Sequence, residues 1–248
     1  MAASIRALAG CVGISGPFSI LRDFFGFWRR RLPPDPTGAR IEVSLKEQVT
    51  RLRGVHSNLN VVWVGSDQFT DNDLIEIDYS IFKLRNVYRS VDVGIGRVQH
   101  WAVPTADADG LDTPTTTGDL EDLTQDWTAP NDGIDLFVPH NMSVPSPGGG
   151  VTLGYSPVDG PCDKNAKGMN GATCGLWGSE QTARTFAHEL GHYLGLSHNH
   201  GDTCPTTAAE QNNLMAQSRC ALSTRNSVLL TSSQGDNMDD HCSINAGC

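Results

Sequence analysis

Apolar residues between positions 71 and 91 recur at steps of three and four, which is the spacing of one face of an α-helix. Thr70 and Asp71 stand before them, and side chains of this kind cap helix N-termini. The pattern therefore predicts a long amphipathic helix that buries one face. The apolar positions are Leu74, Ile77, Ile81, Leu84, Tyr88 and Val91.

Other segments have the composition of β-strands. Residues 61–64 and 134–138 are apolar runs typical of buried strands, and residues 91–103 also have a strand-like composition. Residues 41–45 alternate between apolar and polar positions, as in a half-buried strand. Residues 151–155 follow three glycines and contain a further short strand-like segment. We expect each of these segments to form a strand.

Two shorter helices are also predicted. Leu120, Leu123 and Trp127 indicate a short helix in the middle of the chain. Thr231 and Gln234 have the spacing of a capping box, in which each side chain bonds the backbone of the other residue. A last helix is therefore expected to begin at Thr231.

The proline-rich segment 33–36 interrupts regular structure and predicts a boundary. We expect an N-terminal extension at residues 1–40 and one folded domain at residues 41–248. The extension starts with a short apolar run, and an export signal, a pro-segment and a part of the fold remain alternatives for it. No segment of the sequence reaches the ~20 apolar residues that a membrane-spanning helix needs.

The formal charge of −10 and the isoelectric point near 5.1 argue against a nucleic-acid partner. Binding to phosphates requires clustered lysine and arginine, which this composition does not favour. At 248 residues the chain is long enough to bury a full core. Neither property identifies a substrate or an oligomeric state.

The cysteines are concentrated in the second half of the chain. This usage predicts disulfides in an oxidising compartment, and hence a secreted or extracellular protein. Several connectivities are possible, and sequential pairing is favoured by the spacing; the glycine-rich segment 162–178 is then a stapled loop. Cys11 is left over. The candidates are Cys162, Cys174, Cys204, Cys220, Cys242 and Cys248.

Residues 105–126 are rich in aspartate. Asp107, Asp109 and Asp112 carry oxygen atoms at a spacing that suits Ca²⁺, but the closing glutamate of a twelve-residue calcium loop is missing. A solvated acidic loop is the favoured interpretation, with a Ca²⁺ site as the alternative.

The stretch 185–202 contains the pattern H-E-x-x-H-x-x-G-x-x-H. On a helix, His188 and His192 lie one turn apart and can present two imidazole nitrogens to one metal ion. Gly195 is suited to the left-handed conformation that ends a helix, which returns His198 as a third ligand. Three protein ligands leave zinc one position for water, as in catalytic sites.

Three nearby residues also have side chains of types that can bind a metal ion. Glu189 follows the first histidine and points beside the metal ion without binding it. His200 and Asp202 are alternatives to His198 as the third ligand. The spacing from the helix-ending glycine favours His198.

This motif resembles the signature of the metzincin clan of zinc endopeptidases at every position. The resemblance implies an α/β (α+β) fold with a twisted, mostly parallel sheet, an antiparallel edge strand, a backing helix and an active-site helix. It also implies a small C-terminal subdomain with a methionine turn and a terminal helix. The upper subdomain would comprise residues 41–195 and the lower subdomain residues 196–248.

By the same resemblance, Met215 lies in the tight turn beneath the zinc ligands. The segment Leu153, Gly154 and Tyr155 would be the edge strand along which a substrate peptide binds. The residues that follow the third histidine look most like the pappalysin branch, which implies a Cys204–Cys220 disulfide. Gln217 departs from this pattern, because pappalysins carry tyrosine at that place.

The activity implied is hydrolysis of peptide bonds in a protein or peptide substrate with one Zn²⁺. The zinc lowers the pKa of its bound water, and Glu189 takes the proton of that water and passes it to the leaving amine. The alternatives are a zinc-binding recognition module that does not cleave, and an amidase or deacetylase. The intact Glu189 favours catalysis. A latent form in which Cys11 blocks the zinc is a further hypothesis.

Overall fold

The computed structural model describes residues 55–147, 149–201 and 203–245. Several predictions fall on residues outside these ranges. They are the N-terminal extension 1–40 with Cys11, the strand at 41–45, Asp202 as an alternative ligand, and Cys248 as a disulfide candidate.

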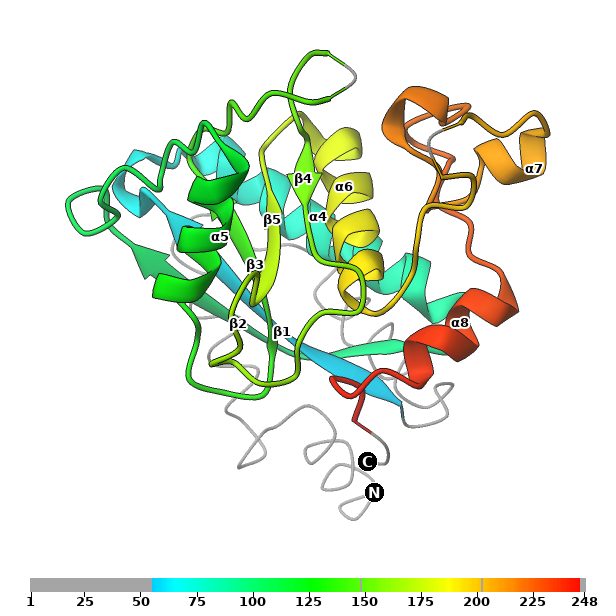
Figure 1. Ribbon diagram of the computed structural model, residues 1–248, viewed down its shortest axis with the longest axis horizontal. Helices are drawn as coiled ribbons and strands as arrows, with labels where there is room; N and C mark the ends of the chain where they lie inside the picture. Colours follow the sequence, from blue (N-terminus) through cyan, green and yellow to red (C-terminus); the bar gives the residue numbers. More distant parts are fainter. Residues whose placement is uncertain (1–54, 148, 202, 246–248) are drawn as a thin grey trace, which may run out of the picture.

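The centre of the fold is a five-stranded sheet in the order β2-β1-β3-β5-β4. The first four strands in this order run parallel, and β4 pairs antiparallel with β5 at the edge (Figure 1). The predicted mostly parallel sheet with an antiparallel edge strand is confirmed. The strands are β1 (His56–Val64), β2 (Gly94–Val103), β3 (Ile134–Pro139), β4 (Gly154–Tyr155) and β5 (Gly171–Cys174).

Helices cover both faces of this sheet. Alternate residues of β1 point to opposite faces: Leu59 and Val61 pack with residues of α4 and α6, whereas Val62 and Val64 pack with Leu123 of α5. The predicted backing helix is therefore α4, beside α6 on the same face (Figure 1). The helices are α4 (Asp71–Arg89), α5 (Thr117–Asp126), α6 (Ser179–Tyr193), α7 (Ala208–Gln211) and α8 (Ser232–Asp239), with short 3₁₀ turns η1 (Ser66–Gln68) and η2 (Ser218–Cys220).

Local capping determines where three of these helices begin. Thr70, Thr116 and Thr231 each accept a bond from the backbone N–H three residues on, and the side chain at that position bonds back to the cap. The predicted starts of the helix after Thr70 and of the last helix after Thr231 are confirmed. A capping box satisfies two backbone donors that a helix terminus leaves open.

The interpretation of residues 162–178 as one irregular loop is wrong in part. Residues Gly171–Cys174 form β5, a fully buried strand between β3 and β4. Glycine and alanine have little intrinsic preference for strands, so the segment carries no local signal. Pairing with β3 on one side and β4 on the other gives it its conformation.

The sequential disulfide pairing is also wrong in part. Cys162 bonds to Cys242, and Cys174 is a buried free thiol in β5. The sequence places Cys162 and Cys174 close together, but the fold brings Cys162 and Cys242 to a Cα–Cα distance of 6.1 Å. The Cys204–Cys220 bond is present, as expected. Two disulfides among the described residues are typical of proteins from oxidising compartments. Within residues 55–245, no helix is both long and apolar enough to cross a membrane.

Replacing both Cys162 and Cys242 with serine is expected to lower the free energy of unfolding by about 4 kcal/mol, because this bond closes a loop of 80 residues. The Cys204/Cys220 double serine variant is the control, since it opens a loop of only 16 residues and should cost about 3 kcal/mol. Urea denaturation of both variants measures the difference. A larger loss in the control variant would contradict the expectation.

Candidate metal centre

Helix α6 carries the first two histidines of the motif. It is buried from Thr182 to Tyr193, and its N-terminus is held by Glu76 of α4, whose Oε1 accepts from the backbone N–H groups of Trp177 and Gly178 at 3.1 and 3.0 Å. The helix thus has a fixed position beside α4, on the same face of the sheet. His188 and His192 lie one turn apart on it.

Gly195 ends the α6 region as predicted. Its φ is +91°, and the N–H groups of Gly195 and Leu196 donate to the carbonyls of His192 and Gly191. These two bonds form the left-handed turn that glycine allows at helix ends. The chain reverses there, and His198 returns to the two histidines on the helix.

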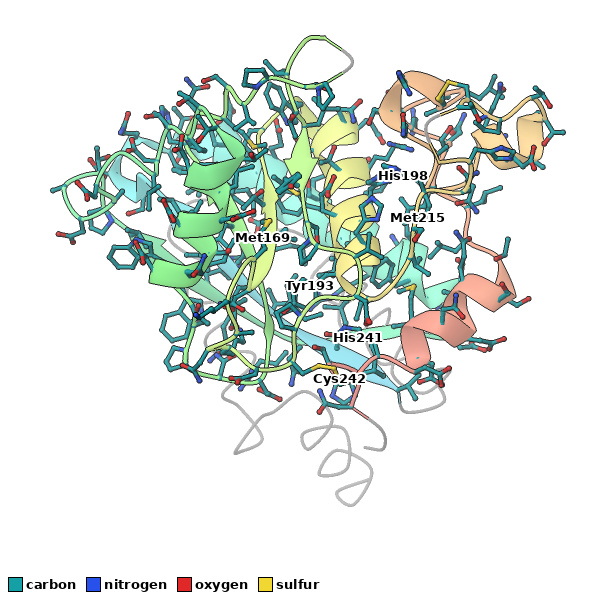
Figure 2. All side chains as sticks on the ribbon, viewed as in Figure 1. Met169, Tyr193, His198, Met215, His241 and Cys242 are labelled. Carbon is teal, nitrogen blue, oxygen red and sulfur yellow. A yellow bond between two sulfur atoms is a disulfide. The ribbon has the colours of Figure 1, made fainter. Side chains whose placement is uncertain are left out.

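The structure brings His188, His192 and His198 together, and Figure 2 labels His198 beside α6. Their Nε2 atoms form a nearly equilateral triangle, with separations of 3.1, 3.2 and 3.2 Å. Tetrahedral zinc with Zn–N bonds near 2.05 Å would hold such nitrogens roughly 3.3 Å apart. The three side chains therefore fit one zinc ion.

The Nδ1 atoms of His188 and His192 bond to backbone carbonyls, which fix the orientation of the two imidazole rings. His188 Nδ1 lies 2.8 Å from the Leu214 carbonyl and His192 Nδ1 lies 2.6 Å from the Leu196 carbonyl. A carbonyl can only accept, so each Nδ1 carries the proton and each Nε2 presents a lone pair. This is the second contact that metal-binding histidines usually make.

Burial keeps these imidazoles neutral. It lowers the pKa of His192 to about 4, and it lowers the pKa of His188 well below its ordinary value, with His192 and Arg184 adding further positive charge. Neutral imidazole is the form that binds a metal. The protonation state of these histidines, like the distances between their Nε2 atoms, therefore suits binding of a metal ion.

Glu189 is 7% exposed and directly follows His188 on α6. Burial raises the pKa of its carboxyl to about 8, and the Arg184 charge opposes this shift. Gly154 of β4 approaches it closely: a Cβ built on Gly154 would lie 2.5 Å from Glu189 Cγ and 2.7 Å from Thr185 Cγ2. The edge strand and the carboxylate are therefore in direct contact.

Met215 is fully buried and packs against α6, beside which Figure 2 labels it. Its sulfur lies where a side chain on Gly191 would otherwise be, because a Cβ built there would be 2.9 Å from Met215 Sδ. The surrounding segment is a tight turn in which the Ala216 N–H donates to the Asn213 carbonyl at 3.1 Å. Met169 packs elsewhere, with Leu120.

The remaining candidates are separated from this centre. His200 is paired with Glu210 at 2.9 Å and does not join the histidine group. Among the described residues, Asp107, Asp109 and Asp112 do not bring ligand atoms together, so the alternative of a Ca²⁺ site has no support. A second group unites Cys162, His241 and Cys242, but its two sulfurs are joined in the disulfide.

Sequence reasoning missed Arg184 as a contributor to the centre, and it named Gln217 only as a departure from the family pattern. Arg184 is buried four residues before His188, and Gln217 places its Nε2 3.4 Å from His198 Nδ1. The signal for Arg184 was its place four residues before His188, on the same face of the helix. The signal for Gln217 was its position two residues after Met215.

Comparisons with known proteins give one family match. The model of Reprolysin_5, described as metallo-peptidase family M12, matches residues 72–229. No curated protein sequence matches the chain. The matched range runs from α4 to beyond the turn at Met215, so it includes all residues of the centre.

Many solved structures are similar to the chain, among them an archaemetzincin and a metalloproteinase. The archaemetzincin of Methanopyrus kandleri is 18% identical with a TM-score of 0.48, over 75% of this chain and 95% of that one. Metalloproteinase-II of Bacteroides fragilis is 13% identical with a TM-score of 0.48, over 75% of this chain and 52% of that one.

Proposed function

The chain belongs to metallopeptidase family M12, and from this premise we propose that it is a zinc-dependent endopeptidase that cleaves protein or peptide substrates. His188, His192 and His198 would hold one zinc ion. The observation that carries the proposal is the triangle of three Nε2 atoms beside a buried carboxylate.

The zinc, when bound, supplies an activated water and polarises the scissile carbonyl. Glu189 is the only acidic residue next to the ligands on α6, and its carboxylate accepts the proton from that water and later passes it to the leaving amine. Burial raises the pKa of this carboxyl to about 8 in the metal-free protein, and the charge of a zinc ion at the histidines would lower it towards the carboxylate form that accepts a proton. No covalent nucleophile takes part.

The substrate would bind along β4. This strand is the edge of the sheet, and an extended peptide can add to such an edge through backbone hydrogen bonds. Gly154 and Tyr155 would supply these contacts. The Leu153 carbonyl already accepts from Gly175 N and Trp177 Nε1, at 3.0 and 2.8 Å, so Leu153 would contribute through its side chain.

We place the protein outside the cell and in the pappalysin branch. The two disulfides support the location. The Cys204–Cys220 bond supports the branch, since the motif resemblance implied it. In this proposal residues 1–40 are a separate extension, Met215 is the methionine of the turn, and residues 41–195 and 196–248 are the two subdomains.

The test is the cleavage-site profile of the purified protein on casein and on a peptide library, with and without the chelator 1,10-phenanthroline. We expect internal cleavage that the chelator abolishes and that Zn²⁺ restores after chelator removal. Calcium should not restore it. Cleavage that survives complete metal removal, or a zinc-loaded protein that binds peptides without cleaving them, would contradict the proposal. Release of acetate from acetylated peptides instead would identify a deacetylase.

A further inference from the structure

Arg184 is an arginine inside the molecule, with 2% of its surface exposed. It lies on α6 four residues, about one turn, before His188, on the side that faces the Met215 turn. Burial lowers its pKa to about 10, so it remains charged at neutral pH. A buried cation is costly unless every donor finds a partner.

The guanidinium satisfies its donors in one region of the chain. Nε donates to the Ser227 carbonyl at 3.0 Å, and Nη1 donates to Ser218 Oγ at 3.2 Å. Nη2 donates to the carbonyls of Leu214, at 3.1 Å, and Ala216. All four acceptors belong to residues 214–227, so one side chain ties this segment to α6.

The Leu214 carbonyl is shared with the candidate ligand. It accepts from Arg184 Nη2 and also from His188 Nδ1, at 3.1 and 2.8 Å. A carbonyl oxygen has two lone pairs, and both are then used. The position of this oxygen determines the tautomer and the orientation of His188.

The same turn also contacts the third histidine and its neighbour. The Met215 carbonyl accepts from Asn199 N at 3.2 Å, and Gln217 Nε2 lies 3.4 Å from His198 Nδ1. A shift of the turn would therefore displace the Leu214 carbonyl that bonds His188. It would also displace the groups that contact His198 and Asn199. The side chain that holds the turn against α6 is Arg184.

We propose that Arg184 is a positioning residue for the metal centre: through its bonds to the turn 214–218 it sets the geometry of His188 relative to His198. The inference rests on the proposed function, because it treats the three histidines as ligands. A guanidinium suits this role, since its planar fork of five donors reaches several carbonyls at once, whereas the single nitrogen of lysine cannot.

The experiment compares R184K with the wild-type chain. Far-UV circular dichroism and thermal unfolding of the metal-free proteins report folding, competition with a chromophoric chelator reports zinc affinity, and the visible spectrum of the Co²⁺ form reports ligand geometry. We expect folded R184K to bind zinc about 10- to 100-fold more weakly, as for other losses of groups that orient metal ligands. Its Co²⁺ bands should shift.

Y88F is the matched control. Tyr88 is also fully buried, and its hydroxyl donates to the Ala187 carbonyl of α6 at 2.9 Å rather than to a carbonyl of the turn. Its loss should lower stability without changing zinc affinity or the Co²⁺ spectrum. An R184K protein with wild-type affinity and spectrum overturns the inference. An equal affinity loss in Y88F also overturns it, because a general loss of stability then explains both.

If R184K does not fold, S218A tests the positioning role of Arg184 instead. It removes one acceptor of Arg184 at an exposed residue and leaves the arginine in place. A several-fold weaker zinc affinity with a shifted Co²⁺ spectrum supports the inference, and an unchanged spectrum and affinity overturn it. The proposed function fails separately: it fails if the zinc-loaded wild-type chain does not cleave peptides, whatever the variants show.

Discussion

Replacing Glu189 with glutamine is expected to lower kcat/KM for peptide cleavage by roughly 10²- to 10⁴-fold while zinc remains bound. Glutamine has nearly the same shape as glutamate but cannot take a proton from water at neutral pH. The three histidines are untouched, so zinc content should stay at one ion per chain. Kinetics on a peptide from the cleavage profile, together with metal analysis of the same sample, measure both quantities.

The control for this prediction is Glu180→Gln on the same helix. Glu180 lies in the first turn of α6, where its carboxylate accepts from the Tyr79 hydroxyl at 2.6 Å, away from the histidines. Activity within about twofold of wild type is expected for it, as for most surface changes. If the glutamine variant at position 189 kept wild-type turnover with zinc bound, Glu189 would not be the base.

The second prediction concerns the contact between the edge strand and this carboxylate. Gly154→Ala should reduce kcat/KM by about 10²-fold, the cost of a displacement near 1 Å in an active site. The added Cβ would fall 2.5 Å from Glu189 Cγ, far below a normal contact. Either the strand moves outward or the carboxylate turns away, and both changes disturb the site. Zinc content should not change.

Gly118→Ala tests whether the effect is specific to position 154. Gly118 lies in α5, and a Cβ there would meet only Thr116 Oγ1, at 3.6 Å. Alanine favours helices over glycine by about 1 kcal/mol, so this variant should be as active as wild type and slightly more stable. Thermal unfolding and the same peptide assay compare the two variants. A folded Gly154→Ala protein with wild-type kcat/KM would show that the close approach has no catalytic consequence.

Features that depend on neighbouring residues could be predicted from the sequence. The start of α4 follows from Thr70 and the apolar positions after it, and the start of α8 follows from Thr231 with Gln234. The meeting of His188, His192 and His198 follows from one helical turn and one glycine with positive φ. These determinants lie within a few residues of one another, and helical geometry converts such spacing directly into distance.

Other features were decided only by the tertiary structure. The partner of Cys162 is 80 positions away, β5 is a strand because β3 and β4 flank it, and Arg184 meets carbonyls 30 to 43 positions downstream. None of these pairs has a local pattern, because packing of the whole chain determines which distant segments touch. The sequence by itself predicted the candidate ligand set and the base that we propose at position 189. The tertiary structure decided what holds them in place: the Leu214 carbonyl under His188, Met215 under Gly191, and Gly154 against Glu189.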